Sequence, residues 1–565
     1  MRKIFFFSAI AVTLASCAFQ GEVADLIVHN ARIYTVDGNF RTCDAMAIVD
    51  GKIIDIGAQQ MILNKYTAGE VIDAQKRPVY PGFIDAHCHF LAYGLKLGEA
   101  NLVGTTSFEE VLQRVKQHAG ETTNEWIIGR GWDQNDWMTE SPEAGSAEQD
   151  KLSAPFPDCH VLDSLFPNRP VVLKRIDGHA MLVNTYVLEL AGISPSTKVD
   201  GGSVGVVGDM CSGILVDNAM ILVDAIMPVH SLEQKQKALM DAQEKTFAVG
   251  LTTVSDAGLM KTDIDAIKSL QEEGKLKMRV YAMLSDSAPN YEYYLAHGID
   301  TASDRLTVRA FKFYADGALG SRGACLLNPY SDIFSELGRK EYGWMLATRN
   351  HFRERFEQLY SAGFQVCTHA IGDSANRAIL NLYGEMLGGV NDLRWRIEHA
   401  QVVDPADLPA FGMYSIIPSV QPTHATSDMP WAWKRLGRNR VRYAYSYNDL
   451  KNQLGIIALG TDFPVEDISP FATFHSAVSR KNNSGEPAGG FQKENALTRE
   501  ETLKGMTLWA AMANFEDAHK GSLEIGKYAD FVILDRDILL VPEEKILGTR
   551  VLYTFIAGEK VFESE

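Results

Sequence analysis

Two histidines one residue apart, His87 and His89, end an apolar stretch that starts at Val79. A β-strand points alternate side chains to the same side, so these two imidazoles face one way. Two imidazoles at one strand end provide half of a site for a divalent metal ion. Such a pair also arises by chance, and histidines satisfied within a core are common. The pair therefore predicts a metal site only if other ligands meet it.

Other candidate ligands follow apolar strands far downstream. His369 and His399 each end such a strand, and Asp462 follows another. Taken singly, each histidine is more simply explained by packing, and Asp462 could cap a helix or hold a turn. Taken with the first pair, four histidines at strand ends are hard to explain as packing. Imidazole and carboxylate ligands suit zinc and other borderline divalent ions. We expect Asp462 to ligate one ion and to accept a proton from the bound water.

Lys312 lies inside a further apolar strand, Arg309 to Tyr314. A buried lysine costs free energy unless it is neutralised or paired. Its amine could react with carbon dioxide to give a carbamate, a carboxylate on a long arm that can bridge two divalent ions. The alternative is an ion pair between Lys312 and an acid such as Asp316 or Asp462.

The order of elements gives these residues a common location. Short apolar strands are predicted to start near Phe83, Leu251, Met278, Leu306, Phe364, Arg394, Tyr414 and Gly455. Helical stretches separate most of them, which indicates parallel βα units. Eight such units suggest a closed (β/α)8 TIM-type barrel, whose active site lies at the carboxyl ends of the strands. All six candidate residues lie at or near such ends.

Strand-rich segments at both ends of the chain flank this α/β middle, which suggests one small β domain built from both termini. Roughly 160 residues separate the first two barrel strands, far more than a usual βα connection, so we expect an inserted subdomain. The predicted division is 17–79 and 520–565 for the β domain, and 80–519 for the barrel, with the insertion at about 100–245.

The first residues predict an exported protein. Arg2 and Lys3 precede an apolar run, residues 4–14, that is too short to span a bilayer and is typical of a secretory signal. The following Ala15-Ser16-Cys17 resembles a bacterial lipobox. We therefore expect residues 1–16 to be a lipoprotein signal peptide and Cys17 to carry lipid, anchoring the protein to a membrane on the periplasmic or cell-surface side. An ordinary cleaved signal peptide is the alternative.

Charge limits the partners. The formal net charge is −18 and no block of lysine and arginine occurs. This argues against nucleic acid and against anionic membrane surfaces as partners. We expect a small-molecule substrate and membrane contact only through the lipid anchor. Whether the protein forms a homodimer is left open.

Seven motifs from residue 24 onward carry a resemblance to a known family. They are PGFIDAHCHF, DGHAMLVN, FKFYADGALGSRGA, CTHAIGDSAN, RIEHAQ, GTDFPVE and GSLEIGKYADFVILD. In order and spacing they resemble the amidohydrolase superfamily, within it the amidohydrolase-3 group of YtcJ-like proteins and N-substituted formamide deformylases. The resemblance implies a metal-bearing barrel with a composite β-sandwich. It implies ligand roles for His87, His89, Lys312 as a carbamate, His369 and His399, with Asp462 as ligand and base.

The chain departs from this group at Ala318, Gly323 and Asp217, where a small hydroxyl residue, a threonine or serine, and a glutamate are usual. These departures leave the metal site intact and put the substrate in doubt. We expect a metal-activated hydroxide, shared by two metal ions, to hydrolyse a carbon–nitrogen bond of the amide type, in an N-substituted formamide or an N-acyl amine. Deaminase or cyclic-amidase activity on the same barrel is one alternative, and a non-catalytic surface binding lipoprotein is another.

Four residues are second-tier candidates. His179 could donate a hydrogen bond to the developing oxyanion, although a lone histidine is as often structural. Arg322 could bind a substrate carboxylate, although an ion pair is the simpler explanation. Trp132 and Asp133 could line the pocket, although an aromatic residue in an insertion more often packs in a core.

Overall fold

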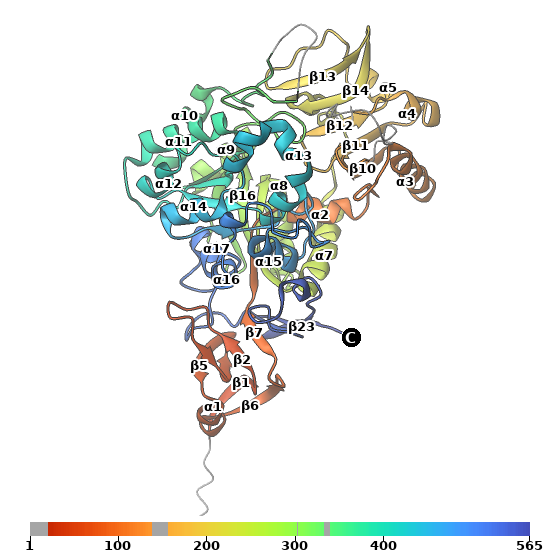
Figure 1. Cartoon of the computed structure of the whole chain (residues 1–565). Helices are drawn as coiled ribbons and strands as arrows, with labels where there is room; N and C mark the ends of the chain where they lie inside the picture. Colours follow the sequence, from red (N-terminus) through yellow and green to blue (C-terminus); the bar gives the residue numbers. More distant parts are fainter. Residues whose placement is uncertain (1–20, 138–155, 302, 333–339) are drawn as a thin grey trace, which may run out of the picture.

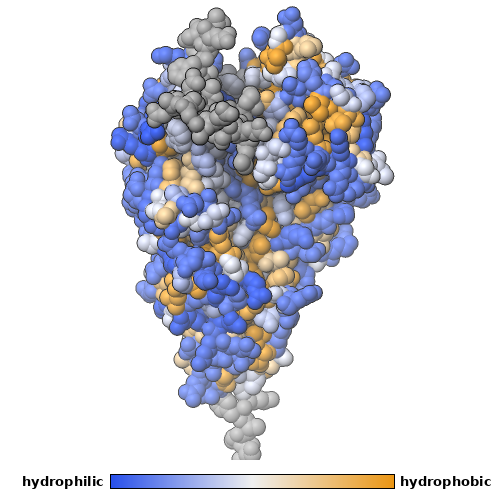
Figure 2. Space-filling view, turned by 45° about the vertical axis from the view of Figure 1, so that its right-hand side comes forward, coloured by the Kyte–Doolittle hydropathy of each residue, from blue (hydrophilic) through white to orange (hydrophobic). Residues whose placement is uncertain are grey.

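The computed structural model describes residues 21–137, 156–301, 303–332 and 340–565. The predicted signal peptide and Cys17 lie outside the described residues. Within the described ranges, no helix has the length and apolar character needed to cross a bilayer. The face of the molecule in Figure 2 is mainly hydrophilic, with hydrophobic residues in small groups.

Eight parallel strands form the central sheet. They are β8 (Phe83–Cys88), β15 (Leu251–Leu259), β16 (Arg279–Ser285), β17 (Leu306–Tyr314), β18 (Gln365–Ala370), β19 (Arg396–His399), β20 (Ile417–Val420) and β21 (Ala458–Leu459). The segment after β21 returns to β8, where the Asp462 amide donates to the His87 carbonyl over 2.8 Å. Each strand begins within three residues of its predicted start. The predicted barrel is therefore confirmed.

Helices cover the outside of this barrel, as Figure 1 shows. Helix α7 (Leu232–Ala248) begins with a capping box in which Ser231 and Gln234 exchange hydrogen bonds. Its buried residues, among them Leu239 and Phe247, face the barrel core. Helix α2 (Phe90–Lys96) packs closely on α7, because a side chain at Gly94 would lie 2.0 Å from the Ala238 carbonyl oxygen. The first strand and its candidate histidines are thus held against a well-packed layer.

The two ends of the chain build one β region, at the narrow end of the molecule in Figure 1. One sheet runs β24 (Glu559–Glu563), β23 (Val551–Ile556), β22 (Phe531–Leu534), β7 (Pro78–Pro81), β2 (Arg32–Tyr34), β3 (Thr42–Cys43). The other runs β5 (Lys52–Gly57), β4 (Ala45–Val49), β1 (Glu22–His29), β6 (Tyr66–Asp73). The hydrophobic core of this β region contains Ile33, Val79, Phe531 and Phe555, so residues from both termini bury one another.

The connection from β8 to β15 contains a separate six-stranded sheet, at the opposite end of the molecule in Figure 1. Its strands are β13 (Gly202–Val207), β14 (Met210–Asp217), β12 (Ala180–Val183), β11 (Val171–Arg175), β10 (Ile127–Trp132) and β9 (Ala100–Asn101). The sheet has its own hydrophobic core, which includes Trp132, Leu173 and Leu182. The predicted insertion after the first barrel strand is confirmed.

A buried ion pair joins the barrel to the β region. Arg279, at the start of β16, donates to both oxygens of Asp530 over 2.7 and 3.0 Å, and both residues are buried. Burial alone would raise the pKa of Asp530, but the Arg279 guanidinium outweighs it and leaves that pKa below its usual value. The carboxylate therefore stabilises the fold above its unfolded-state pKa, and that contribution is lost as the pH falls through its folded-state pKa.

We expect Asp530→Asn to lower the free energy of unfolding by about 3 kcal/mol at pH 7, because it leaves the buried Arg279 with only the half-exposed Asp304, 3.3 Å away, as a counter-charge. Denaturant unfolding measures the change. Asp392→Asn, which removes an exposed partner of Arg394, is the matched control and should cost less than about 1 kcal/mol. Equal costs for the two variants would contradict a special role for the buried pair.

Candidate metal centre

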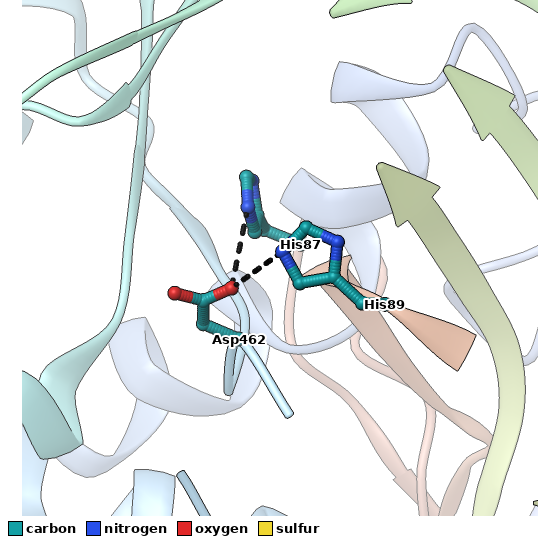
Figure 3. A group of neighbouring side chains, drawn as sticks. All are labelled: His87, His89 and Asp462. Atoms are coloured by element: carbon teal, nitrogen blue, oxygen red, sulfur yellow. Dashed lines mark ion pairs between the residues drawn. The ribbon is translucent and has the colours of Figure 1, made fainter. Parts of the chain in front are cut away.

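The predicted ligands of the first and last barrel strands meet at the carboxyl end of the barrel. His87 lies in β8, and His89 directly precedes α2. Their Nε2 atoms lie 3.5 and 3.2 Å from one oxygen of Asp462, Oδ1, which follows β21. Figure 3 shows the three side chains pointing toward one another. Residues separated by nearly the whole barrel therefore form one cluster of nitrogen and oxygen donors.

The remaining predicted ligands surround the same point. Lys312, buried in β17, places its Nζ 3.2 Å from the His87 Nε2. The ring centroid of His399, at the end of β19, lies 4.9 Å from that of His87 and 4.6 Å from that of His369 in β18. The structure thus brings all six predicted residues together.

Three buried polar atoms of this cluster have no hydrogen-bond partner among the described residues: the Nε2 atoms of His369 and His424, and Asp462 Oδ1. Buried polar atoms are normally satisfied, and each exception requires an explanation. Ligand atoms of His399, His424 and Asp462 lie within 4.8 Å of one another, as do those of His87, His89 and Asp462. Imidazole nitrogens and a carboxylate are donors that divalent cations such as zinc prefer, so the residues present fit such an ion.

Outer hydrogen bonds orient three of the imidazoles. His87 Nδ1 lies 2.6 Å from Glu398 Oε2. His89 Nδ1 lies 2.9 Å from the Ala257 carbonyl oxygen, and His399 Nδ1 lies 2.7 Å from Gln421 Oε1. An N–H donated at Nδ1 leaves the lone pair at Nε2, which faces the cluster. Burial and the nearby Lys312 lower the pKa of His87 to about 4, so this imidazole is neutral at pH 7.

Glu398 was not among the predicted residues, although it lies one position before His399. It accepts from Arg396 Nε over 2.6 Å, and the same guanidinium donates to the Ala86 carbonyl over 2.7 Å. Burial opposes its charge, but Arg396 and His87 outweigh it and hold the pKa of Glu398 well below its usual value. An ionised Glu398 therefore fixes the His87 ring from behind.

We expect Glu398→Gln to weaken zinc affinity about 10–100-fold, because the neutral amide no longer orients His87 or strengthens it as a donor. Competition with a chelating dye measures the affinity. Glu385→Gln, at an exposed site paired with Arg349 and Arg353, is the control and should leave the affinity unchanged. Unaltered zinc binding in Glu398→Gln would show that His87 needs no such support.

Burial makes the charge of the Lys312 amine less favourable than in water. Burial lowers its pKa to about 8, and the carboxylates of Glu398 and Asp462 limit the effect. Within the described ranges, Lys312 forms no ion pair. Asp316, one of the acids considered as its partner, instead accepts backbone N–H groups of Cys325, Ile371 and Gly372 over 2.8–3.0 Å. An amine that is partly unprotonated near neutral pH can react with carbon dioxide.

The cluster opens into a cavity of about 870 Å³, lined by the barrel ends and by the insertion. His179 lies there, with Nδ1 2.6 Å from Asp217 Oδ1, and Asp217 also accepts from Trp344 Nε1 over 3.0 Å. Burial opposes a charge on His179, but Asp217 outweighs it and raises its pKa. The ring centroid of His179 lies 5.1 Å from that of His369, so the structure brings this second-tier candidate to the centre.

Of the other three second-tier candidates, one lines the cavity and two do not. Asp133 lines the cavity and pairs with Arg175. Trp132 does not line it. Its indole is buried in the core of the insertion and donates to the Leu173 carbonyl over 2.8 Å. Arg322 does not line it either, because its guanidinium pairs with Asp332 over 3.0 Å. The structure therefore places neither Trp132 nor Arg322 at this cavity, and their contact with substrate stays a prediction.

His424 was missed. It lies in α13 (Pro422–Arg440), directly after β20, with Nε2 3.6 Å from Asp462 Oδ2 and its ring stacked 5.8 Å from that of His399. Its place just beyond the end of the seventh barrel strand is the signal that could have identified it.

A (β/α)8 barrel with nitrogen and oxygen donors at the carboxyl ends of its strands is typical of enzymes that use bound divalent cations. The chain belongs to the amidohydrolase family, whose model matches residues 70–562. The predicted resemblance is therefore confirmed, and the protein is a metal-dependent hydrolase of this family.

Relatives span nearly the whole chain. Protein LONG AFTER FAR-RED 3 of Arabidopsis thaliana is 32% identical over 96% of this chain and 92% of its own. Putative amidohydrolase YtcJ of Bacillus subtilis is 30% identical, over 95% and 99%. N-substituted formamide deformylase of Arthrobacter pascens is 22% identical, over 96% and 99%. The crystal structure of an uncharacterized metal-dependent hydrolase from Pyrococcus horikoshii superposes with a TM-score of 0.73 and 28% identity, covering 92% of this chain and 99% of that one.

Proposed function

We propose that this protein hydrolyses a carbon–nitrogen bond of the amide type, in an N-substituted formamide or an N-acyl amine. The observation that carries the proposal is the Lys312 amine, buried without a carboxylate partner 3.2 Å from a histidine of the donor cluster. An amine with a lowered pKa at that place supports a carbamate and hence a two-ion centre. The names of the relatives from Bacillus subtilis and Arthrobacter pascens support the amide class.

The residues that would hold two divalent ions, with zinc as the expected metal, are His87, His89, Lys312, His369, His399 and Asp462. When bound, such ions polarise a carbonyl group and lower the pKa of water. The Lys312 nitrogen would form a bond to the carbon of carbon dioxide and release a proton, which leaves a carbamate anion. Histidines bind a metal ion as neutral imidazoles, so this anion and Asp462 would supply the negative charge of the site.

Three side chains would handle protons and charge in the reaction. Asp462 would take the proton of the attacking water and return it to the leaving nitrogen. Burial opposes its ionised form, but His89, His87 and His399 outweigh it and hold the pKa of Asp462 well below its usual value. His179, whose pKa Asp217 raises, would donate to the carbonyl oxygen as negative charge develops there.

Metal removal and restoration test this proposal. The purified protein is analysed for metal, treated with a chelator, and assayed with formamides and N-acyl amines before and after zinc is returned. We expect about two divalent ions per chain, loss of hydrolysis on chelation and recovery with zinc. One ion per chain with release of ammonia from an aminated ring would favour a deaminase. Zinc-loaded protein that hydrolyses no amide of the panel would contradict the proposal.

A further inference from the structure

Arg130 reaches from the insertion into the cavity that holds the metal centre. It lies on β10, where the pairing with β11 shifts register between Arg130 and Trp132, and Gly131 adopts a φ of 115°. This irregularity separates the two side chains, so Trp132 enters the insertion core and Arg130 faces the cavity. A side chain at Gly178 would lie 3.1 Å from Arg130 Nη2, so the guanidinium lies against the residue that precedes His179.

The Arg130 guanidinium makes no hydrogen bond or ion pair with any described residue, and its Nε is buried. Its neighbour in the same sheet, Arg175, is fully satisfied by Asp133, Asp177 and Gln134. Burial lowers the pKa of Arg130, and the acids Glu99 and Asp462, close enough to favour its charge, do not pair with it. An unpaired cation that is partly buried is costly, so a charge facing a cavity indicates a missing anion.

Lys96 adds a second cation to the same wall of the cavity. Its Nζ donates only over 3.5 Å, to the Pro464 carbonyl, and burial together with Arg130 lowers its pKa to about 8. Two cationic side chains that disfavour each other's charge would both be stabilised by an anion between them. The Tyr314 hydroxyl, which has no hydrogen-bond partner among the described residues, opens into the same cavity.

We propose that Arg130, supported by Lys96, binds a carboxylate of the substrate, so that the substrate is an amide that carries a carboxylate. This inference rests on the proposed function. The planar guanidinium matches a carboxylate with two parallel hydrogen bonds. A monoanion fits better than a phosphate dianion, because Asp136, Asp428 and Asp467 also line the cavity and would repel a second charge.

Binding to the zinc-loaded enzyme tests the site without turnover. The probe is 4-oxo-4-phenylbutanoate, a ketone analogue of N-benzoylglycine, and its primary amide is the neutral partner. By calorimetry we expect the wild type to prefer the carboxylate, and Arg130→Met to weaken only that ligand, about 10–100-fold. The affinity of Arg130→Lys for the carboxylate should lie between that of the wild type and that of Arg130→Met. Arg114→Met, an arginine of the same insertion paired with Glu110, is the matched control.

Turnover then shows on which side of the scissile bond the carboxylate lies. N-benzoylglycine carries it on the amine side and N-phenylsuccinamic acid on the acyl side, and each is compared with its primary amide. We expect Arg130→Met to lower kcat/KM for one acid about 10–100-fold while its neutral amide is little affected.

The outcomes separate this inference from the proposed function. Carboxylate binding that depends on Arg130 in an enzyme that hydrolyses none of these amides would uphold the anion site and contradict the proposed function. The anion site would be overturned if hydrolysis or ligand binding showed no preference for the carboxylate, or if Arg130→Met affected acid and amide equally. Either result would leave the proposed function standing.

Discussion

Replacing Asp462 by asparagine is expected to lower kcat about 10³-fold, because the variant keeps an oxygen donor and loses the proton acceptor. The residue is placed for both roles. Its backbone is fixed by the hydrogen bond to the His87 carbonyl. Its Oδ1 has no hydrogen-bond partner among the described residues and faces the imidazoles of His87 and His89. The measurement is kcat on the best amide substrate, with zinc occupancy matched between variant and wild type.

Asp404→Asn, an acid after β19 paired with Arg377 at the surface, is the control and should retain wild-type kcat. A variant at Asp462 that binds zinc normally and turns over at the wild-type rate would contradict its role as base. His424, whose Nε2 lies 3.6 Å from Asp462 Oδ2, would then be the next proton acceptor to examine.

The strand positions could be predicted because parallel barrel strands are buried on both faces and read as short apolar runs. His87 and His89 also follow from the sequence, since alternation within one strand fixes their common direction. The convergence of His369, His399 and Asp462 required only the rule that barrel strands present their carboxyl ends to one face. The six candidates are therefore consequences of strand register.

The supporting residues could not be predicted in the same way. Glu398 acts on His87 from 311 positions away, a partnership that depends on side-chain geometry across the barrel. Arg130 and Trp132 have the spacing of residues on one strand face, and only the irregularity at Gly131 separates them. Arg322 has the chemistry of a carboxylate ligand, but Asp332, ten positions later, satisfies it. In each case local backbone geometry or a specific partner decides the role.

Lys312→Ala is expected to abolish most of the activity, because removal of the proposed bridging carbamate forfeits several kcal/mol of transition-state stabilisation, equivalent to about 10³-fold in rate. The truncation also leaves room beside His87, since the amine lies 3.2 Å from that imidazole. Added pentanoate replaces the atoms of a lysine carbamate beyond Cβ one for one. We therefore expect pentanoate to restore part of the zinc content and of kcat in the variant.

Propylamine is the matched control, because it replaces the atoms of an unmodified lysine beyond Cβ. If Lys312 acts only as an amine paired with Asp462, propylamine should restore kcat and pentanoate should not. Rescue by the carboxylate alone indicates that the site requires an anion at the end of this side chain, which an unmodified lysine cannot supply. The same measurements in the wild type, where the space is filled, should show no effect of either compound.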